Sequence, residues 1–250
     1  MVAALVLPFF LPDYRVQLFP RSEAPSWAHL FGTDELGRDI LSRVTQGARI
    51  SLMVATGAVV VAATIGAGVG LIAGFAGGWL DALLMRLVDA AMAIPRLLVL
   101  LLVLAVLDSI PLPLLIVLLG ATGWFGTSRL VRAEVLRLRG EGFVSAARAL
   151  GAGSRRIIFR HLVPNAAGPL IVAATLAVAD VLLLEAGLSF LGLGVRIPMP
   201  SWGAMIQSGV AYRSTAPWIC LFPGLAIVIT VLAVTLIGEG LRQSLTPERA

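Results

Sequence analysis

The chain contains no lysine, a single cysteine and two histidines, and only 13% of its 250 residues are charged. Without lysine it cannot carry a phosphate-binding P-loop, whose lysine contacts the β- and γ-phosphates, and it cannot form a Schiff base with a substrate. The lone thiol, Cys220, excludes an internal disulfide. We therefore expect that the chain does not hydrolyse ATP itself, performs no catalysis and binds no cofactor of its own.

Apolar residues are abundant, at 58% of the chain with a mean hydropathy of +0.95, which indicates an integral membrane protein. A helix needs ~20 apolar residues to cross a hydrocarbon core of ~30 Å. The sequence predicts an all-α transmembrane protein with five full spans, near 50–73, 83–107, 112–128, 166–190 and 217–238. The apolar residues 1–11 are too short to span, lack the features of a signal peptide and are expected to be the end of a truncated sixth span.

Arginine density predicts the orientation in the membrane. The loop from 129 to 161 holds eight arginines and two acidic residues, whereas the segment 12–48 holds four arginines and five acidic residues. The positive-inside rule places the arginine-rich loop in the cytoplasm, residues 195–216 outside and the tail from 239 inside. His29 and His161 then lie on opposite sides and cannot share a metal ion. Because arginines beside apolar spans are a topology signal, we expect contact with membrane lipid and not with nucleic acid.

The arginine-rich loop contains a helical pattern from Phe143 to Leu150, an interruption at 151–153 and a second short helix with Ser154 as its expected N-cap. Pro164 is expected to end this unit. Alanines in the first helix permit close approach of another backbone, and apolar side chains in the second supply area to bury. The pattern indicates a docking surface with an arginine rim; the alternative is a solvated loop that covers the membrane surface.

Two further patterns concern packing. Thr33 is a plausible N-cap for an amphipathic helix at the outer interface, with Leu36, Ile40, Leu41 and Val44 on one face; this helix either positions the next span or contacts an external partner. Small residues that recur every four positions, suited to close helix packing within the chain or against a second subunit, are Gly66, Gly70, Gly74 and Gly78.

Charged residues at membrane depth are candidates for function, because they are costly in lipid. Arg86 and Asp89 lie three residues apart and are expected to pair with each other. Arg96, beside Pro95, has no obvious local partner. Asp180 and Glu185 could line a translocation path or form interhelical hydrogen bonds, and the sequence does not separate these alternatives.

The loop resembles the EAA coupling motif of ABC importer permeases. Ala146, Ala147, Gly151 and Pro164 stand at motif positions, whereas Ser145 replaces the motif glutamate and removes an anionic contact to the ATPase. The resemblance implies contact with an ATPase for Ser145, Ala146, Ala147, Leu150, Gly151, Arg155, Arg156, Phe159 and Pro164.

Other segments are similar to the dipeptide, oligopeptide and nickel permease family. They are residues 29–43 with 47–52, 185–194, 200–205 and 216–218, in the order that the family has them. The resemblance implies the type I ABC importer permease fold. It also implies an external segment with the interfacial helix over 1–48, a core domain over 49–239 that includes the coupling loop 129–165, and a cytoplasmic tail over 240–250.

The same resemblance implies a non-catalytic subunit of a bacterial or archaeal plasma (inner) membrane importer of dipeptides or oligopeptides, with nickel or glutathione as alternative cargo. Its expected partners are a second permease subunit, two ATPase subunits that bind ATP and magnesium, and an external solute-binding protein. The competing class is a secondary transporter or channel driven by an ion gradient. That class predicts inverted repeats and paired carboxylates at mid-membrane, and the sequence shows no convincing repeat.

Overall fold

The computed structural model describes residues 13–17, 19–107, 110–195 and 199–245. Within these ranges the regular structure is helical apart from one isolated bridge between Thr33 and Asp39. The predicted all-α fold is confirmed. The apolar segment 1–11, expected as a truncated span, and the last five residues of the predicted tail lie outside the described residues.

Three helical runs are long and apolar enough to cross a membrane: α2 (Ile40–Ala76), the run Ser154–Phe190 that ends in α9 (Val163–Phe190), and α11 (Trp218–Leu245). Two bent pairs provide two more candidate spans. In the first, α3 (Gly78–Met92) and α4 (Arg96–Val106) meet at 73°, and in the second, α5 (Leu112–Ala121) and α6 (Phe125–Arg139) meet at 49°. The five predicted spans correspond to these elements, but two of them are broken. Pro95 lies at the first break, where a helix would lack an amide donor.

The chain divides into two compact units. The first consists of Met1–Thr56, Leu101–Leu115 and Val178–Val234, and the second of Gly57–Leu100, Ile116–Ala177 and Thr235–Ala250. The long helices α2, α9 and α11 therefore contribute residues to both units.

The core of the first unit joins the start of α2, the short helix α10 (Trp202–Gly209) and the start of α11. The buried apolar side chains at its centre are Ile40, Val44, Met205, Ala216 and Ile219. Trp202 is buried beside them, and its indole N–H donates to the carbonyl of Val44 at 2.9 Å. A 3-10 turn, η3 (Val210–Tyr212), follows α10.

The predicted amphipathic helix from Thr33 is wrong. The Thr33 hydroxyl donates to the carbonyl of Pro20 at 2.6 Å, and Asp34 Oδ1 accepts from the backbone N–H of Leu36 and Arg38, so residues 33–38 form a turn. Helix α2 begins at Ile40 instead. Asp39 caps it by accepting from the N–H of Ser42 at 2.8 Å. A turn forms here in place of the predicted helix because the Asp34 side chain accepts hydrogen bonds from two nearby backbone N–H groups.

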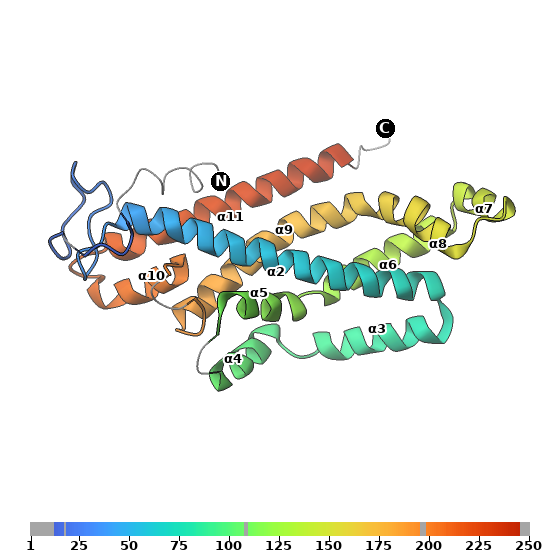
Figure 1. Cartoon of the computed structure of the whole chain (residues 1–250), viewed down its shortest axis with the longest axis horizontal. Coiled ribbons are helices and arrows are strands. Elements are labelled where there is room, and N and C mark those ends of the chain that lie inside the picture. The colour runs from blue at the N-terminus through green and yellow to red at the C-terminus, as the bar shows by residue number, and fades with distance from the viewer. Residues whose placement is uncertain (1–12, 18, 108–109, 196–198, 246–250) are drawn as a thin grey trace. The chain divides into compact units, whose positions relative to one another are not determined.

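In the second unit the chain reverses between α2 and α3, as Figure 1 shows. Gly77 and Gly78 have φ of 66° and 59°, a left-handed conformation that favours glycine. Gly78 serves this reversal, and a Cβ atom at its position would meet no neighbour within 4 Å, so it does not share the contact of the other three glycines. Those three lie against α6. A Cβ atom would lie 2.7 Å from Thr127 Cβ at Gly66, 2.5 Å from the Ser128 carbonyl at Gly70 and 2.9 Å from Val135 Cβ at Gly74.

Candidate functional site

Two short helices, α7 (Gly142–Ala149) and α8 (Ser154–Ile157), form a hairpin that follows α6 (Figure 1). Buried apolar side chains attach this hairpin to α6. Val144, Ile157 and Leu162 are at most 3% exposed and share one core with side chains of α6 and α9. The α6 and α9 members of this core are Val131, Val135, Leu138 and Ala166. The hairpin is thus fixed to the helices and is not a loose surface loop.

The hairpin and the π-helical turn after it, η2 (Ile158–Leu162), also carry two large apolar side chains that are exposed. Leu150 is 89% exposed and Phe159 68% exposed, in contrast to the buried Ile157 between them in sequence. Gly151, in a turn with φ of 80°, separates the two helices. The predicted ATPase-contacting residues lie on this hairpin, except Phe159, which is in η2, and Pro164, which is in the first turn of α9 (Val163–Phe190). Most are exposed, namely Ser145, Ala146, Leu150, Gly151, Arg155, Arg156, Phe159 and Pro164. Ala147 is half-buried.

Two details of the predicted hairpin are wrong. Ser154 is not the N-cap of α8; Gly153 holds that position and makes no side-chain cap hydrogen bond. Pro164 does not end the unit, because a π-helical turn, η2 (Ile158–Leu162), leads directly into α9. In that turn the N–H of Val163 donates to the carbonyl of Ile158, five residues back. The wider π turn accommodates a residue without a backbone N–H in the first turn of α9.

The arginines of the predicted cytoplasmic loop fall into two groups. On α6, Arg132 forms a bidentate pair with Asp81 of α3, with N–O distances of 2.5 and 2.6 Å, and Arg129 pairs with Asp89. Arg137 bonds to Glu134 and Glu141. The expected pairing of Arg86 with Asp89 is therefore wrong, since Asp89 reaches across to α6 instead.

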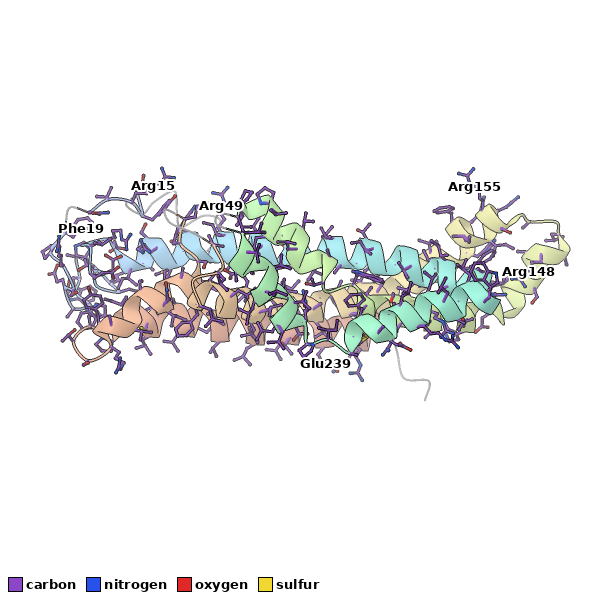
Figure 2. The ribbon with its side chains drawn as sticks, turned by 90° about the horizontal axis from the view of Figure 1, so that it is seen from below. Arg15, Phe19, Arg49, Arg148, Arg155 and Glu239 are labelled. Carbon is purple, nitrogen blue, oxygen red and sulfur yellow. The ribbon has the colours of Figure 1, made fainter. Side chains whose placement is uncertain are left out.

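On the hairpin and the π turn, four arginines form no ion pair with any residue in the described ranges: Arg148, Arg155, Arg156 and Arg160. All four side chains are exposed. Figure 2 labels Arg148 and Arg155 on this hairpin, and Arg155 extends away from the ribbon. Exposed apolar side chains and exposed positive charges thus occur together within residues 148–160. Such a surface complements an acidic protein surface that presents an apolar groove.

Glu185 of α9 is fully buried, and both of its oxygens accept hydrogen bonds. Ser51 of α2 donates to Oε2 at 3.0 Å and Ser189 donates to Oε1 at 2.6 Å. The backbone N–H of Trp202, at the start of α10, lies 3.5 Å from the Ser51 hydroxyl. Of the two alternatives for Glu185, the structure shows the interhelical hydrogen bond. This network joins α2, α9 and α10.

The other predicted charges at membrane depth are placed differently. Arg96 begins α4 and donates to the carbonyl of Leu119 at 2.5 Å and to the Thr122 hydroxyl at 3.2 Å. It therefore satisfies groups at the end of α5, and it lines a cavity of about 450 Å³ between the two helix breaks with Pro95 and Gly123. Asp180 is exposed on α9. Its role in a translocation path stays a prediction.

Several site residues were missed in the sequence because their partners are distant along the chain. Ser51 and Glu185 are separated by 134 positions, and Asp81 and Arg132 by 51. Single serines and aspartates carry no periodic signal. The signal that was available for Asp81 was its charge within an apolar segment, which predicts a buried or paired partner.

Comparison with known proteins gives three concordant findings. Residues 66–249 match the family model described as binding-protein-dependent transport system inner membrane component. The chain is 45% identical over 255 residues to a protein of Brucella suis biovar 1 whose name places it among the peptide permeases, covering 99% of this chain and 83% of that protein. It is 40% identical over 254 residues to the oligopeptide transport system permease protein OppC of Bacillus subtilis, covering 99% and 83%.

Among solved structures, an inward-facing MetNI methionine ABC transporter contains a similar chain. The TM-score is 0.68 at 21% sequence identity, and the alignment covers 83% of this chain and 98% of that one. This likeness shows the fold alone, which is that of a type I ABC importer permease.

Proposed function

Because the chain belongs to the family of binding-protein-dependent transport system inner membrane components, a family of multi-pass plasma membrane proteins, we propose that it forms half of the translocation path of an ATP-driven importer of dipeptides and oligopeptides. The names of the relatives in Brucella suis and Bacillus subtilis support peptides as cargo. Nickel and glutathione remain alternative cargo, because similar permeases carry them.

The proposal includes a division of labour among subunits. ATP and magnesium bind to two partner ATPase subunits, a second permease supplies the other half of the path, and a solute-binding protein delivers cargo from outside. The α7–α8 hairpin docks on one ATPase. The observation that carries this assignment is the exposure of large apolar side chains next to exposed arginines in sequence: Leu150, at the turn of the hairpin, is 89% exposed, and Phe159, in η2, is 68% exposed.

The geometry around the hairpin supports a mechanical role. Its inner face packs on α6 through Val144 and Ile157, and α8 continues through the π turn into α9 as one helical run to Phe190. Movement of an ATPase against the hairpin would therefore be transmitted to two membrane helices. ATP binding draws the two ATPases together and favours one state of the path, and hydrolysis restores the other.

The candidates for contact with cargo in the membrane are Arg96, Asp180 and Glu185. Arg96 has the strongest support, because it lines a cavity of about 450 Å³ at the breaks of two spans. Helix breaks in transporters place backbone termini where they bind charged groups of a substrate. Glu185 has the weakest support as a cargo contact, because both of its carboxylate oxygens already accept hydrogen bonds from serine hydroxyls.

The double variant Leu150→Asp with Gly151→Asp tests the coupling role. We expect it to reach the membrane at normal abundance but to lose co-purification of the ATPase and ATP-dependent uptake of a dipeptide, because it places two negative charges on the docking face. Aspartate tolerates the left-handed conformation at position 151 better than most residues. The matched control is Leu245→Asp, which alters an exposed leucine at the end of α11.

Retention of both co-purification and uptake by the double variant would reduce the hairpin to a topological loop. The competing transporter class is tested by measuring dipeptide uptake by the wild-type protein in membrane vesicles. ATP-dependent uptake that survives collapse of the proton gradient excludes a secondary transporter, whereas uptake that stops with the gradient excludes the ATP-driven importer.

A further inference from the structure

A second cavity, of about 540 Å³, lies in the first unit between the turn at 34–38 and α10. Figure 1 shows the dark blue segment that leads into α2 near α10. The volume of this cavity is in the range of small-molecule sites. The walls are mixed: charged groups come from Glu35, Arg38 and Arg43, amide groups from Gln17 and Gln207, and apolar surface from Leu36 and Pro200. By the predicted topology this cavity opens on the external side of the membrane.

One carboxylate oxygen of Glu35, a lining residue of this cavity, is buried without a hydrogen-bond partner. Oε1 of Glu35 accepts from Arg38 at 3.3 Å, but Oε2 of Glu35 is enclosed and receives no hydrogen bond from the described part of the chain. A buried carboxylate oxygen that lacks a donor destabilises the protein, because it has lost its hydrogen bonds to water without replacing them. A donor that enters the cavity would remove that destabilisation.

The groups around Glu35 are held in place before any ligand arrives. Asp34 accepts from Arg38 Nε at 2.6 Å and lies 3.4 Å from Arg43 Nε, so the two arginines share one carboxylate. Asp34 is 3% exposed as a side chain, and its other oxygen accepts two backbone N–H groups. Glu35 is the acidic side chain with an oxygen left for an additional donor. Preorganised charges of this kind discriminate between ligands by their ionised groups.

We propose that this cavity binds the amino-terminal end of a peptide, with the ammonium group donating to Oε2 of Glu35. An ammonium supplies three N–H donors and a positive charge, which a carboxylate binds more strongly than a neutral amide does. The amides of Gln17 and Gln207 are available on the same walls for the peptide backbone. This inference rests on peptides being the cargo and adds an external subsite to the path.

The cavity is also joined to the buried network of the membrane helices. Ser189 lines the cavity, and its hydroxyl donates to Glu185, which accepts from Ser51 of α2. The backbone N–H of Val195, another wall residue, donates to Ser189 at 3.1 Å. A peptide in the cavity would thus contact the same serine that orients Glu185.

The test uses the assembled transporter in lipid nanodiscs, without the solute-binding protein. Binding of dialanine and of N-acetyl-dialanine, which lacks the ammonium, is measured by calorimetry. We expect Glu35→Gln to weaken dialanine binding by about tenfold to a hundredfold, because it removes a charge-assisted hydrogen bond. N-acetyl-dialanine should bind weakly to both proteins. The matched control is Glu239→Gln, on an exposed pair with Arg242.

A second variant separates loss of the site from loss of the fold. Ala204→Leu narrows the cavity from α10 and leaves Glu35 in place, so it should also abolish dialanine binding. Unchanged dialanine binding in both variants, or equal binding of the acetylated peptide, overturns the inference; if uptake with the binding protein continues, the proposed function stands. If the wild-type transporter takes up no peptide, the proposed function itself fails. Loss of stimulation by the solute-binding protein with unchanged dialanine binding would overturn the peptide subsite and assign the cavity to that protein.

Discussion

At the scale of single residues, the buried carboxylate of Glu185 is held by two serine hydroxyls from α2 and α9. We expect Glu185→Ala to destabilise the protein, by about 1–3 kcal/mol for each polar group left unsatisfied, in addition to the cavity it creates. Glu185→Gln, which keeps the size and most hydrogen bonds, should cost less. Thermal unfolding of the purified transporter in detergent measures both.

A double-mutant cycle that combines Glu185→Ala with Ser51→Ala provides the control for this network. If Ser51 acts on stability through Glu185, the cost of Glu185→Ala should be smaller in the Ser51→Ala background than in the wild type. Strictly additive costs would show that the 3.0 Å contact between the two side chains contributes nothing measurable.

At the scale of elements, the hairpin has one face for the fold and one for a partner. Ile157 is 3% exposed and Leu150 is 89% exposed. We expect Ile157→Ala to lower stability by about 2–5 kcal/mol, as for a core truncation. Leu150→Ala should leave stability within about 0.5 kcal/mol and still weaken retention of the ATPase. Thermal unfolding and co-purification, measured on the same preparations, separate the two roles. If the two variants lowered stability and ATPase retention to the same extent, the assignment of Ile157 to the fold and of Leu150 to partner binding would be wrong.

At the scale of the whole molecule, the positive-inside rule predicts opposite sides for the hairpin and for the segment after α10. In a Cys220→Ala background, Arg213→Cys should react with a membrane-impermeant maleimide in intact spheroplasts, because Arg213 is exposed and predicted to lie outside. Arg148→Cys, also exposed, should react only after permeabilisation. Labelling in the reverse order would invert the orientation, and with it the assignment of the hairpin to the ATPases.

The candidate site was partly predictable. The hairpin could be located because its signals are local: alanine-rich helix, glycine turn and arginines lie within about twenty consecutive residues, the kind of pattern that sequence periodicity detects. The start of α2 could not, because Thr33 and Asp39 are both good N-cap residues and only the turn around Asp34 selected Asp39. The prediction of an Arg86–Asp89 pair was wrong for a related reason: Arg86 lies three residues from Asp89 on the same helix, but Asp89 pairs with Arg129 on α6 instead.

By itself, the sequence determined the membrane class, the helical fold and the approximate spans, because hydrophobic length and arginine density are properties of consecutive residues. The tertiary structure decided which charges are paired. Arg132 could have been one more topology signal, and only packing of α3 against α6 assigned it to Asp81, whereas Arg148 and Arg155 stay exposed on the hairpin. The physical reason is that a hydrogen bond depends on distances of a few ångströms between helices, which no local pattern encodes.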